Sequence, residues 1–332
     1  MEVVILHQQV PEAGLPGSEA EQDVLVQVEL VAGVLERLGH AVAKRPCDPD
    51  LEELRQELTR RRPGLAFNLV ESLAGDDRLA AAAPILLEAL RIPYTGAPAA
   101  AWLLAADKRI MKRHLTEGGI PTPPWCDGTL PGEPPEFPGD FVIKTVGQHA
   151  SWGLTDDCVV HVANEVELAE QLRHVERRIG YPCFAEQYIE GREFNVSLLA
   201  DRNDVEVLPI AEIVFADYPS GKPRIVGYAA KWQVDSFEYQ HTPRRFDLPE
   251  EDQPLLEQLA RLAQEVWKRF GMRGYARVDF RVDRHGRPWV LEVNPNPCLS
   301  PDAGFAAACA QAGLSTTEVI GRIVQAALVN HE

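Results

Sequence analysis

The chain has 332 residues, with 33 basic and 50 acidic side chains and a formal net charge of −17 at pH 7. This length accommodates about two or three domains with buried cores, and 45% hydrophobic and 25% charged residues are ordinary values for a soluble globular protein. Because so acidic a surface repels nucleic acid and anionic lipid, we expect neither as a partner. The densest basic run, Arg60-Arg61-Arg62, ends a helical pattern and is expected to be solvated.

Nothing in the sequence predicts a membrane segment or a disulfide framework. No stretch approaches the roughly 18 apolar residues that span a bilayer, and the start Met1–Leu6 lacks the basic region of a signal peptide. The six cysteines are scattered and form no CxxC pair. We therefore expect a reduced, cytoplasmic protein without structural zinc.

The first hundred residues alternate short apolar runs with helical patterns. Val3–Leu6 and Leu65–Leu69 predict buried strands, and apolar residues at helical spacing predict helices over 24–38 and 80–90. Alternation of this kind favours a small parallel α/β domain of Rossmann-like type. A further helix, carrying Asp107, follows it.

Beyond this helix the pattern changes. Prolines mark residues 120–139 as a turn-rich connection, which is either a linker between domains or a surface excursion within one fold. Several strands are then predicted in succession, at 141–144, 158–160, 184–189, 194–200 and 205–214. An amphipathic helix over 255–270, two strands joined by a hairpin at Asp283–Gly286 and a last helix at 316–329 complete the chain. The whole is expected to be α/β first and α+β afterwards.

Charged and amide residues interrupt the last two apolar strands. Arg277 and Asp279 are two positions apart and share a face, and so do Glu292 and Asn294. If the hairpin pairs these strands, all four side chains converge on one sheet surface. Oxygen ligands of this type suit magnesium, which leaves positions for substrate phosphates. An exposed hairpin with cross-strand ion pairs explains the spacing equally well, although the rigid turn Asn294–Pro297 weighs against it.

Three lysines and a glycine-containing loop are candidates for binding phosphate. Lys144 ends a strand, Lys108 lies on the helix before it, and Lys231 follows a short apolar run. Each lysine taken singly is more typical of a solvated side chain. The loop Gly147–Gly153 carries Ser151 between two glycines, and its backbone amides could cap phosphates. It is neither a Walker loop nor a GxGxxG fingerprint, so a plain hairpin loop is the alternative.

Other catalytic patterns are absent. The sequence contains no GxSxG elbow and no HExxH motif. His149, within the loop, is expected to be an ordinary loop residue rather than a base. No fingerprint supports hydride transfer.

Taken in order, these motifs resemble the ATP-grasp superfamily, specifically its D-alanine–D-alanine ligase branch, over nearly the whole chain. The resemblance rests on the following segments: Gly17-Ser18-Glu19-Ala20-Glu21, Ile92-Pro93-Tyr94-Thr95-Gly96, Asp107-Lys108, Lys144, Glu186-Gln187-Tyr188-Ile189, Gly191-Arg192-Glu193, Ala230-Lys231, Arg277-Val278-Asp279-Phe280 and Leu291-Glu292-Val293-Asn294. It implies a three-domain ATP-grasp fold, with an N-terminal α/β domain at 1–106, a central subdomain at 107–190 and a C-terminal subdomain at 191–332.

The resemblance further implies a carboxylate–amine ligase. ATP would phosphorylate one amino acid carboxylate to an acyl phosphate, and an amine would displace the phosphate to form an amide bond. The roles implied for the nucleotide are these: ATP phosphates at Lys108 and Lys144, adenine at Glu186 and the backbone of Tyr188 and Ile189, ribose at Glu193, and γ-phosphate at Lys231. Two magnesium ions, with manganese as the alternative, would be held by Asp279, Glu292 and Asn294.

Three further residues are implied in the chemistry itself. Arg277 would stabilise the charge on the acyl phosphate and the tetrahedral intermediate, and Ser151 is a candidate catalytic residue in the loop. Glu21 matches the acid that orients the first amino group, although a solvated helix start is the alternative in so acidic a run. An acyl phosphate hydrolyses in water, so the loop Gly147–Gly153 and the segment 216–240 are expected to act as lids.

The substrate regions depart from the family pattern. The stretch Asn68–Asp77 lacks the histidine usual there, and Cys298 stands where the family has a glycine. The serine pair that grips the acceptor carboxylate is missing, which leaves Ser300 as a candidate. Ligase chemistry is therefore better supported than specificity for D-alanine.

Several alternatives stay open. The chain could ligate a different amino acid or a specialised metabolite, bind nucleotide without turnover, or act as a phosphotransferase or carboxylase on the same fold. We expect small amino acid substrates and, from the resemblance, a homodimer formed through the N-terminal domain.

Overall fold

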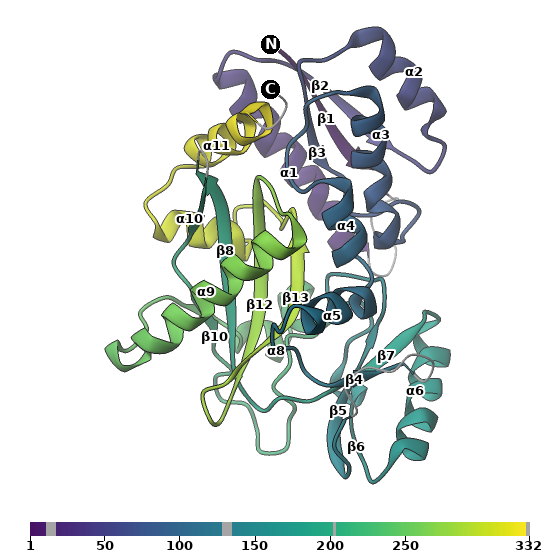
Figure 1. Ribbon diagram of the computed structural model, residues 1–332, viewed down its shortest axis with the longest axis vertical. Helices are drawn as coiled ribbons and strands as arrows, with labels where there is room; N and C mark the ends of the chain where they lie inside the picture. Colours follow the sequence, from purple (N-terminus) through teal and green to yellow (C-terminus); the bar gives the residue numbers. More distant parts are fainter. Residues whose placement is uncertain (11–17, 128–134, 202–203, 330–332) are drawn as a thin grey trace.

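The computed structural model describes residues 1–10, 18–127, 135–201 and 204–329, and within the first helix the side chains from Gln22 onward. Three sheets follow one another along the long axis of the molecule in Figure 1, and both termini lie at the same end. Their order along this axis differs from their order in the sequence. The sheet of the C-terminal half occupies the middle.

The N-terminal sheet is a small parallel α/β unit, as predicted. Its strands run in the order β2-β1-β3, with the bounds β1 (Glu2–Gln8), β2 (Ala41–Cys47) and β3 (Leu65–Leu69). Parallel strands need crossover connections, and these contain α1 (Ser18–Arg37) and α2 (Leu51–Arg61), while η1 (Asp77–Ala81) and α3 (Ala82–Leu90) follow the last strand. Every residue of β3 is buried, which explains its continuous apolar run.

A four-stranded antiparallel sheet lies at the opposite end of the molecule. Its order is β4-β7-β5-β6, with the bounds β4 (Trp125–Cys126), β5 (Gly139–Thr145), β6 (Val159–Val162) and β7 (Cys183–Gln187). η2 (Asp156–Cys158) precedes β6, and α6 (Glu165–Ile179) packs on the sheet through Leu168, Leu172 and Val175. The strand-rich pattern predicted from residue 141 onward omitted α6, although Asn164 caps it and its apolar residues have helical spacing.

The sheet in the middle has six strands and carries the predicted hairpin. Its order is β11-β10-β8-β12-β13, with β9 paired to β8, and the bounds are β8 (Gly191–Asp201), β9 (Asp204–Val207), β10 (Ala211–Ile213), β11 (Arg244–Arg245), β12 (Tyr275–Asp283) and β13 (Pro288–Pro295). The single strand predicted over 205–214 is wrong in detail, because β9 ends at Val207 and β10 begins only at Ala211. η3 (Glu250–Asp252) leads into α9 (Gln253–Phe270), which covers one face of this sheet.

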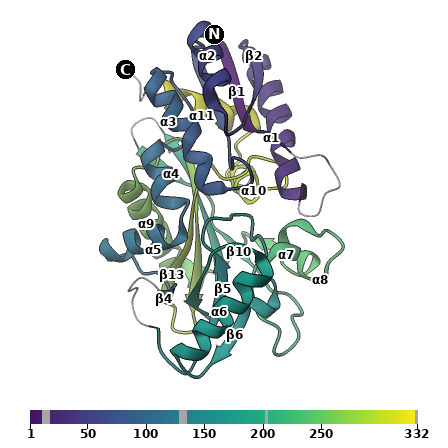
Figure 2. The same ribbon diagram turned by 90° about the vertical axis from the view of Figure 1, so that its right-hand side faces the viewer.

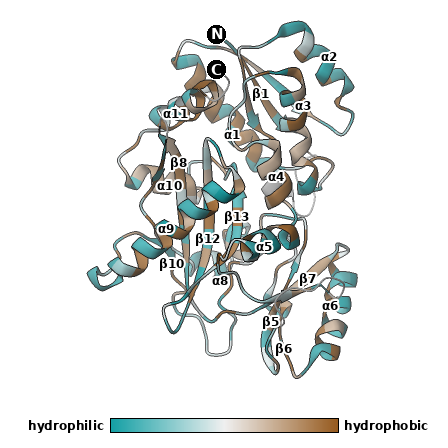
Figure 3. Cartoon of the chain, in the orientation of Figure 1, coloured by the Kyte–Doolittle hydropathy of each residue, from teal (hydrophilic) through white to brown (hydrophobic). Residues whose placement is uncertain are grey.

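The hydrophobic cores cross between these units. α4 (Ala99–Ala105), apolar along its length in Figure 3, and α5 (Lys108–Glu117) pack into the core beneath the six-stranded sheet. α10 (Gly304–Gln311) and α11 (Thr316–Val329) pack instead with α1 and β3. The three-part division of the chain stays a prediction, because these helices share cores with sheets on the other side of its boundaries.

The polar stretch before β11 contains two short helices, α7 (Tyr228–Trp232) and α8 (Phe237–Gln240). In Figure 2 they project beside β10, while β5, β6 and α6 face the viewer. All six cysteines are free. Within the part of the chain that the structure describes, no helix combines the length and apolarity that crossing a bilayer requires.

Candidate active site

A cavity of 540 Å³ extends between the four-stranded and six-stranded sheets and reaches the N-terminal unit. Its wall is built mainly by β5, β7, β8, β12 and β13, by the loop 147–153 and by α7. Twelve of the residues singled out from the sequence line it: Lys108, Lys144, Ser151, Glu186, Tyr188, Ile189, Glu193, Lys231, Arg277, Asp279, Glu292 and Asn294. The side chain of Glu21, which the sequence also predicted as a site residue, lies outside the described residues.

The hairpin brings its four polar residues together as predicted. Asp279 lies opposite Glu292 in the register of β12 and β13, and Arg277 lies opposite Asn294. Arg277 donates from Nε to Asp279 Oδ1 at 2.7 Å and from Nη2 to Oδ2 at 2.9 Å. Because Asp279 is only 7% exposed, the alternative of a solvated hairpin with surface ion pairs is wrong. Burial opposes the charge of Arg277, but Asp279 raises the pKa of this guanidinium above its usual value.

Two amides complete the contacts of Asp279. Asn195 Nδ2 donates to Oδ1 at 2.8 Å, and Asn294 Nδ2 donates to Oδ2 at 3.1 Å. Asn195 was not predicted, although it lies opposite Asp279 on β8. It is a polar residue between Phe194 and Val196, so the pattern that revealed Asp279 would have found it too.

Glu292 lies among basic side chains. Its Oε1 lies 3.6 Å from Lys108 Nζ and 3.2 Å from His149 Nδ1. Burial would raise the pKa of the Glu292 carboxyl, but Lys108, His149 and Lys231 hold it well below its usual range. His149 lies in the loop as expected, and its ring contacts a candidate metal ligand, a contact that the sequence did not predict.

Glu186 joins two lysines at the base of the cavity. Lys144 Nζ forms an ion pair with Oε1, and Lys112 Nζ lies 2.6 Å from Oε2. Burial alone would raise the pKa of Glu186, but these two cations lower it. Lys112 was not predicted, although it follows Lys108 by one helical turn. It is fully buried and also donates to Thr122 Oγ1 at 2.8 Å.

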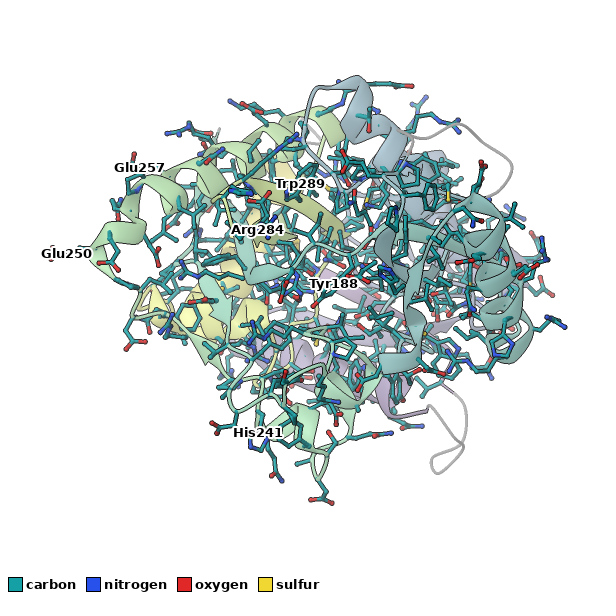
Figure 4. The ribbon with its side chains drawn as sticks, turned by 90° about the horizontal axis from the view of Figure 1, so that it is seen from below. Tyr188, His241, Glu250, Glu257, Arg284 and Trp289 are labelled. Carbon is teal, nitrogen blue, oxygen red and sulfur yellow. The ribbon has the colours of Figure 1, made fainter. Side chains whose placement is uncertain are left out.

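Glu193, Tyr188 and Ile189 lie together at the other side of the same cavity. Glu193 Oε2 is 3.4 Å from Arg281 Nη1, and burial raises the pKa of this carboxyl. The Tyr188 hydroxyl accepts from the backbone N–H of Arg224 at 3.1 Å. Figure 4 shows Tyr188 near the middle of the molecule, whereas Glu250 lies at its edge. Glu193 is buried, whereas Tyr188 and Ile189 are partly exposed, and all three line the cavity.

The two segments predicted as lids contact each other over the cavity. Ser151 Oγ donates to the carbonyl of Val226 at 2.8 Å, and Trp232 Nε1 donates to the carbonyl of Ala150 at 3.0 Å. Lys231, the residue before this tryptophan, lines the cavity, and burial lowers the pKa of its ammonium group. The Ser151 hydroxyl is thus hydrogen-bonded to the backbone of the facing segment, which also carries Lys231.

Asp279 and Glu292 fit a divalent cation whose remaining coordination positions are filled by a bound substrate such as a nucleotide. Among the described residues, no group of three or more histidine, cysteine or acidic side chains is arranged to hold a metal. Asp279, Glu292 and Asn294 nevertheless offer oxygen donors on paired strands beside Lys108. Magnesium characteristically binds one or two carboxylates and completes its octahedron with water and substrate phosphates. This donor set therefore fits a cation that arrives with a nucleotide.

The N-terminal unit contributes a second acidic set that was not predicted. Asp23 and Glu71 both line the cavity, and Gln27 Nε2 bridges them at 3.3 Å and 3.0 Å. Burial, together with Asp23 and Asp77, raises the pKa of Glu71 to about 7. No spacing rule links residues so far apart in sequence, so only the fold reveals this pair.

Ser300 does not fit the role considered for it. The side chain is 1% exposed, and Oγ donates to Asp23 Oδ1 at 2.7 Å. Cys298, which lines the cavity, donates from Sγ to Oδ2 of the same carboxylate at 2.9 Å. The Ser300 hydroxyl therefore has a structural role outside the cavity lining, because it is already hydrogen-bonded to the carboxylate of Asp23.

Comparison with known proteins agrees with this geometry. A family model described as the D-ala D-ala ligase C-terminus matches residues 141–325. A D-alanine–D-alanine ligase of Carboxydothermus hydrogenoformans is 30% identical over 325 residues, covering 94% of this chain and 96% of that protein. An uncharacterized protein of Sinorhizobium fredii is 31% identical over 270 residues, covering 80% of this chain and 75% of its own length.

A solved structure is similar over the whole length. The D-alanine–D-alanine ligase from Bacillus anthracis complexed with ATP superposes with a TM-score of 0.73 at 21% identity, covering 100% of this chain and 98% of that one. At this level of identity the likeness concerns the fold.

Proposed function

Since the chain belongs to the D-alanine–D-alanine ligase family of the ATP-grasp fold, we propose that it is an ATP-dependent ligase joining amino acids through an amide bond. One amino acid carboxylate receives the γ-phosphoryl group of ATP, and the amine of a second displaces phosphate from the acyl phosphate. ADP and phosphate are the other products. The observation that carries this proposal is the set of Arg277, Asp279 and Glu292 on paired strands, which lies in one cavity with Lys108 and Lys144.

Phosphoryl transfer depends on positioning and on charge stabilisation rather than on a covalent protein group. In our proposal Lys108, Lys144 and Lys231 hold the ATP phosphates, and Arg277 stabilises the negative charge that develops on the transferred group. Ion pairs with carboxylates fix Lys108, Lys144 and Arg277 before substrate arrives. The nucleoside is assigned to the wall formed by Glu186, the backbone of Tyr188 and Ile189, and Glu193.

A divalent cation is part of the proposal. We assign two magnesium ions, or manganese in their place, to Asp279, Glu292 and Asn294. When bound, the ions neutralise charge on the phosphate oxygens. The chain's own contribution is to keep the Glu292 carboxylate ionised, and the low pKa of Glu292 supports this role.

The lid residues would exclude water from the acyl phosphate. The hydrogen bonds of Ser151 and Trp232 to the facing segment support closure over the cavity. We assign Ser151 to catalysis through its place in this loop, and Glu21 to orientation of the first amino group.

The remaining expectations stand as further proposals: small amino acid substrates, a homodimer formed through the N-terminal unit, a cytoplasmic location, and domains divided at 1–106, 107–190 and 191–332. Sedimentation of the purified chain tests the dimer, and limited proteolysis tests the domain boundaries.

A substrate panel tests the proposed function directly. The purified chain is incubated with ATP, magnesium and pairs of D- and L-amino acids, while phosphate release is measured and products are identified by mass. We expect amide product and phosphate in equal amounts, with both abolished by a chelator. ATP binding without product from any pair would contradict the proposal and favour a nucleotide-binding protein without turnover.

Arg277→Ala gives the corresponding test for a single residue. We expect turnover to fall by about 100- to 1,000-fold, as when a preorganised charge-stabilising donor is lost, while ATP binding is retained. Unchanged turnover would refute the role assigned to Arg277.

A further inference from the structure

Arg244 is a cation of the cavity wall. It lies on β11, at the edge of the six-stranded sheet, and its side chain is exposed to the cavity. Among the residues that the structure describes, its guanidinium takes part in no ion pair or hydrogen bond. By contrast, Lys108, Lys144 and Arg277 in the same wall each contact a carboxylate.

A second arginine faces the same space. Arg277 uses Nε and Nη2 on Asp279, which leaves Nη1 for another partner. This Nη1 lies 3.9 Å, and Arg244 Nε lies 3.7 Å, from the point where a side chain at Gly304 would begin. Because Gly304 has no side chain, the region between the two guanidinium groups is open to the cavity.

Two arginines so close repel each other unless an anion lies between them. Asp302, also in the cavity wall, acts on Arg244 electrostatically but forms no ion pair with it. Arg277 acts on it with the opposite sign. A carboxylate matches this arrangement well, since guanidinium groups bind carboxylates through paired, charge-assisted hydrogen bonds.

The nucleotide is not the partner that the geometry favours for Arg244. In the proposed function the phosphates lie at Lys108, Lys144 and Lys231. Arg244 instead lines the cavity with Cys298, whose thiol contacts Asp23 of the N-terminal unit. Arg244 therefore faces the part of the cavity that is left for the substrates.

We propose that Arg244, together with Nη1 of Arg277, binds the free carboxylate of the acceptor, the substrate whose amine forms the new bond. The inference rests on the proposed ligase function and names the side chain that recognises the carboxylate of the acceptor amino acid. Arg277 contacts both the activated group and the acceptor in this arrangement, so it brings the amine beside the carbonyl that it attacks.

Arg245 provides a matched control. It follows Arg244 on β11, so its side chain points to the opposite face of the sheet. It forms an ion pair with Glu212 and does not line the cavity. Replacing either arginine with alanine removes one positive charge from the same short strand, but only one replacement alters the cavity.

The first experiment compares an acceptor with its own carboxamide. The best acceptor from the amino acid panel and the corresponding amide, for example D-alanine and D-alaninamide, compete for a saturating donor, and products are separated by mass. We expect the native chain to prefer the acid, Arg244→Ala to reduce that preference about 10- to 100-fold, and Arg244→Lys to retain part of it. Arg245→Ala should keep the native preference.

A second measurement does not depend on turnover. Binding of D-alanine and of D-alaninamide is measured by calorimetry with a non-hydrolysable ATP analogue and magnesium present. Weaker binding of the acid alone by Arg244→Ala supports the proposal. An acid-over-amide preference that Arg244→Ala retains, in either experiment, overturns it, even if the native chain proves to be a ligase. Absence of product and of amino acid binding in the native chain would overturn both proposals.

Discussion

The two ends of the cavity differ in how their charges are balanced. At the end assigned to phosphates, Lys108, Lys144 and Arg277 each contact a carboxylate, and these contacts hold the side chains in place. At the substrate end, Arg244 faces the cavity without an ion-pair partner among the described residues, and Glu71 lies beside a second carboxylate, Asp23. The phosphate end is preorganised by the protein itself, whereas the charges of the substrate end are left for a ligand to balance.

The largest expected effect is at the phosphate end. Glu292→Gln removes a candidate metal ligand and leaves Lys108 and His149 without their carboxylate. We expect turnover to fall by about 1,000-fold or more, since the divalent cation loses a ligand and the side chains of Lys108 and His149 lose the carboxylate that positions them. Steady-state kinetics at saturating ATP measures this effect. Glu206→Gln, which removes a carboxylate from a surface pair with Arg322, should leave turnover unchanged.

Disrupting the contacts of Glu186 with its two lysines should lower the stability of the protein even when no substrate is bound. Lys112→Met removes a fully buried cation and leaves Glu186 with only one of its two lysines. We expect the free energy of unfolding to fall by about 3–5 kcal/mol, the range for breaking a buried pair. Urea denaturation checks this. Arg113→Met on the exposed side of the same helix should change stability by less than about 0.5 kcal/mol; equal effects of the two substitutions would show that the buried contact does not matter.

The acidic pair at the substrate end, Asp23 and Glu71, predicts that stability depends on pH. Burial raises the pKa of Glu71 to about 7 in the folded protein, so the folded state binds this proton more tightly than the unfolded chain does. Its contribution to stability is present below the unfolded pKa and is lost as pH rises through about 7. Glu71→Gln does not titrate, so its stability relative to the native chain should increase by about 3 kcal/mol between pH 4 and pH 8. Denaturation midpoints across this range test it, and a constant difference would refute it.

The smallest expected effect is that of Ser300→Ala, which should lower stability without changing recognition of the acceptor. Ser300→Ala removes a buried hydrogen bond to Asp23 and should cost about 2 kcal/mol of stability. The KM for the acceptor should stay within about threefold of the native value, because this hydroxyl does not line the cavity. A rise in the acceptor KM as large as that of Arg244→Ala would reverse the comparison and return the acceptor carboxylate to Ser300.

The difference between the two ends also explains which residues the sequence could predict. Arg277, Asp279, Glu292 and Asn294 lie on two strands joined by a short hairpin, so period-2 alternation places them on one face before any tertiary contact is known. Asn195 follows the same rule on the neighbouring strand and could have been found. Local geometry was sufficient in each case.

Local periodicity could not predict the site residues that come together only through packing between distant segments. Asp23, Glu71 and Cys298 come from three separate parts of the chain, and only the docking of α1 and β3 against the segment after β13 brings them together. Arg244 is one of two adjacent arginines, and nothing local distinguishes the one in the cavity from the one paired with Glu212. Pairing of β11 with β10 decides which side chain faces the cavity.

The sequence by itself determined the α/β and α+β architecture and the shared face of the polar residues in the final hairpin, because each rests on periodicity within one or two elements. The resemblance to a known family supplied the proposal that the lysines bind phosphate. The tertiary structure alone decided how these charges are paired, why Ser300 is withdrawn from the cavity, and where an unpaired arginine remains. Burial and ion pairing depend on what packs around a side chain, and this packing is fixed only when segments far apart in the chain meet.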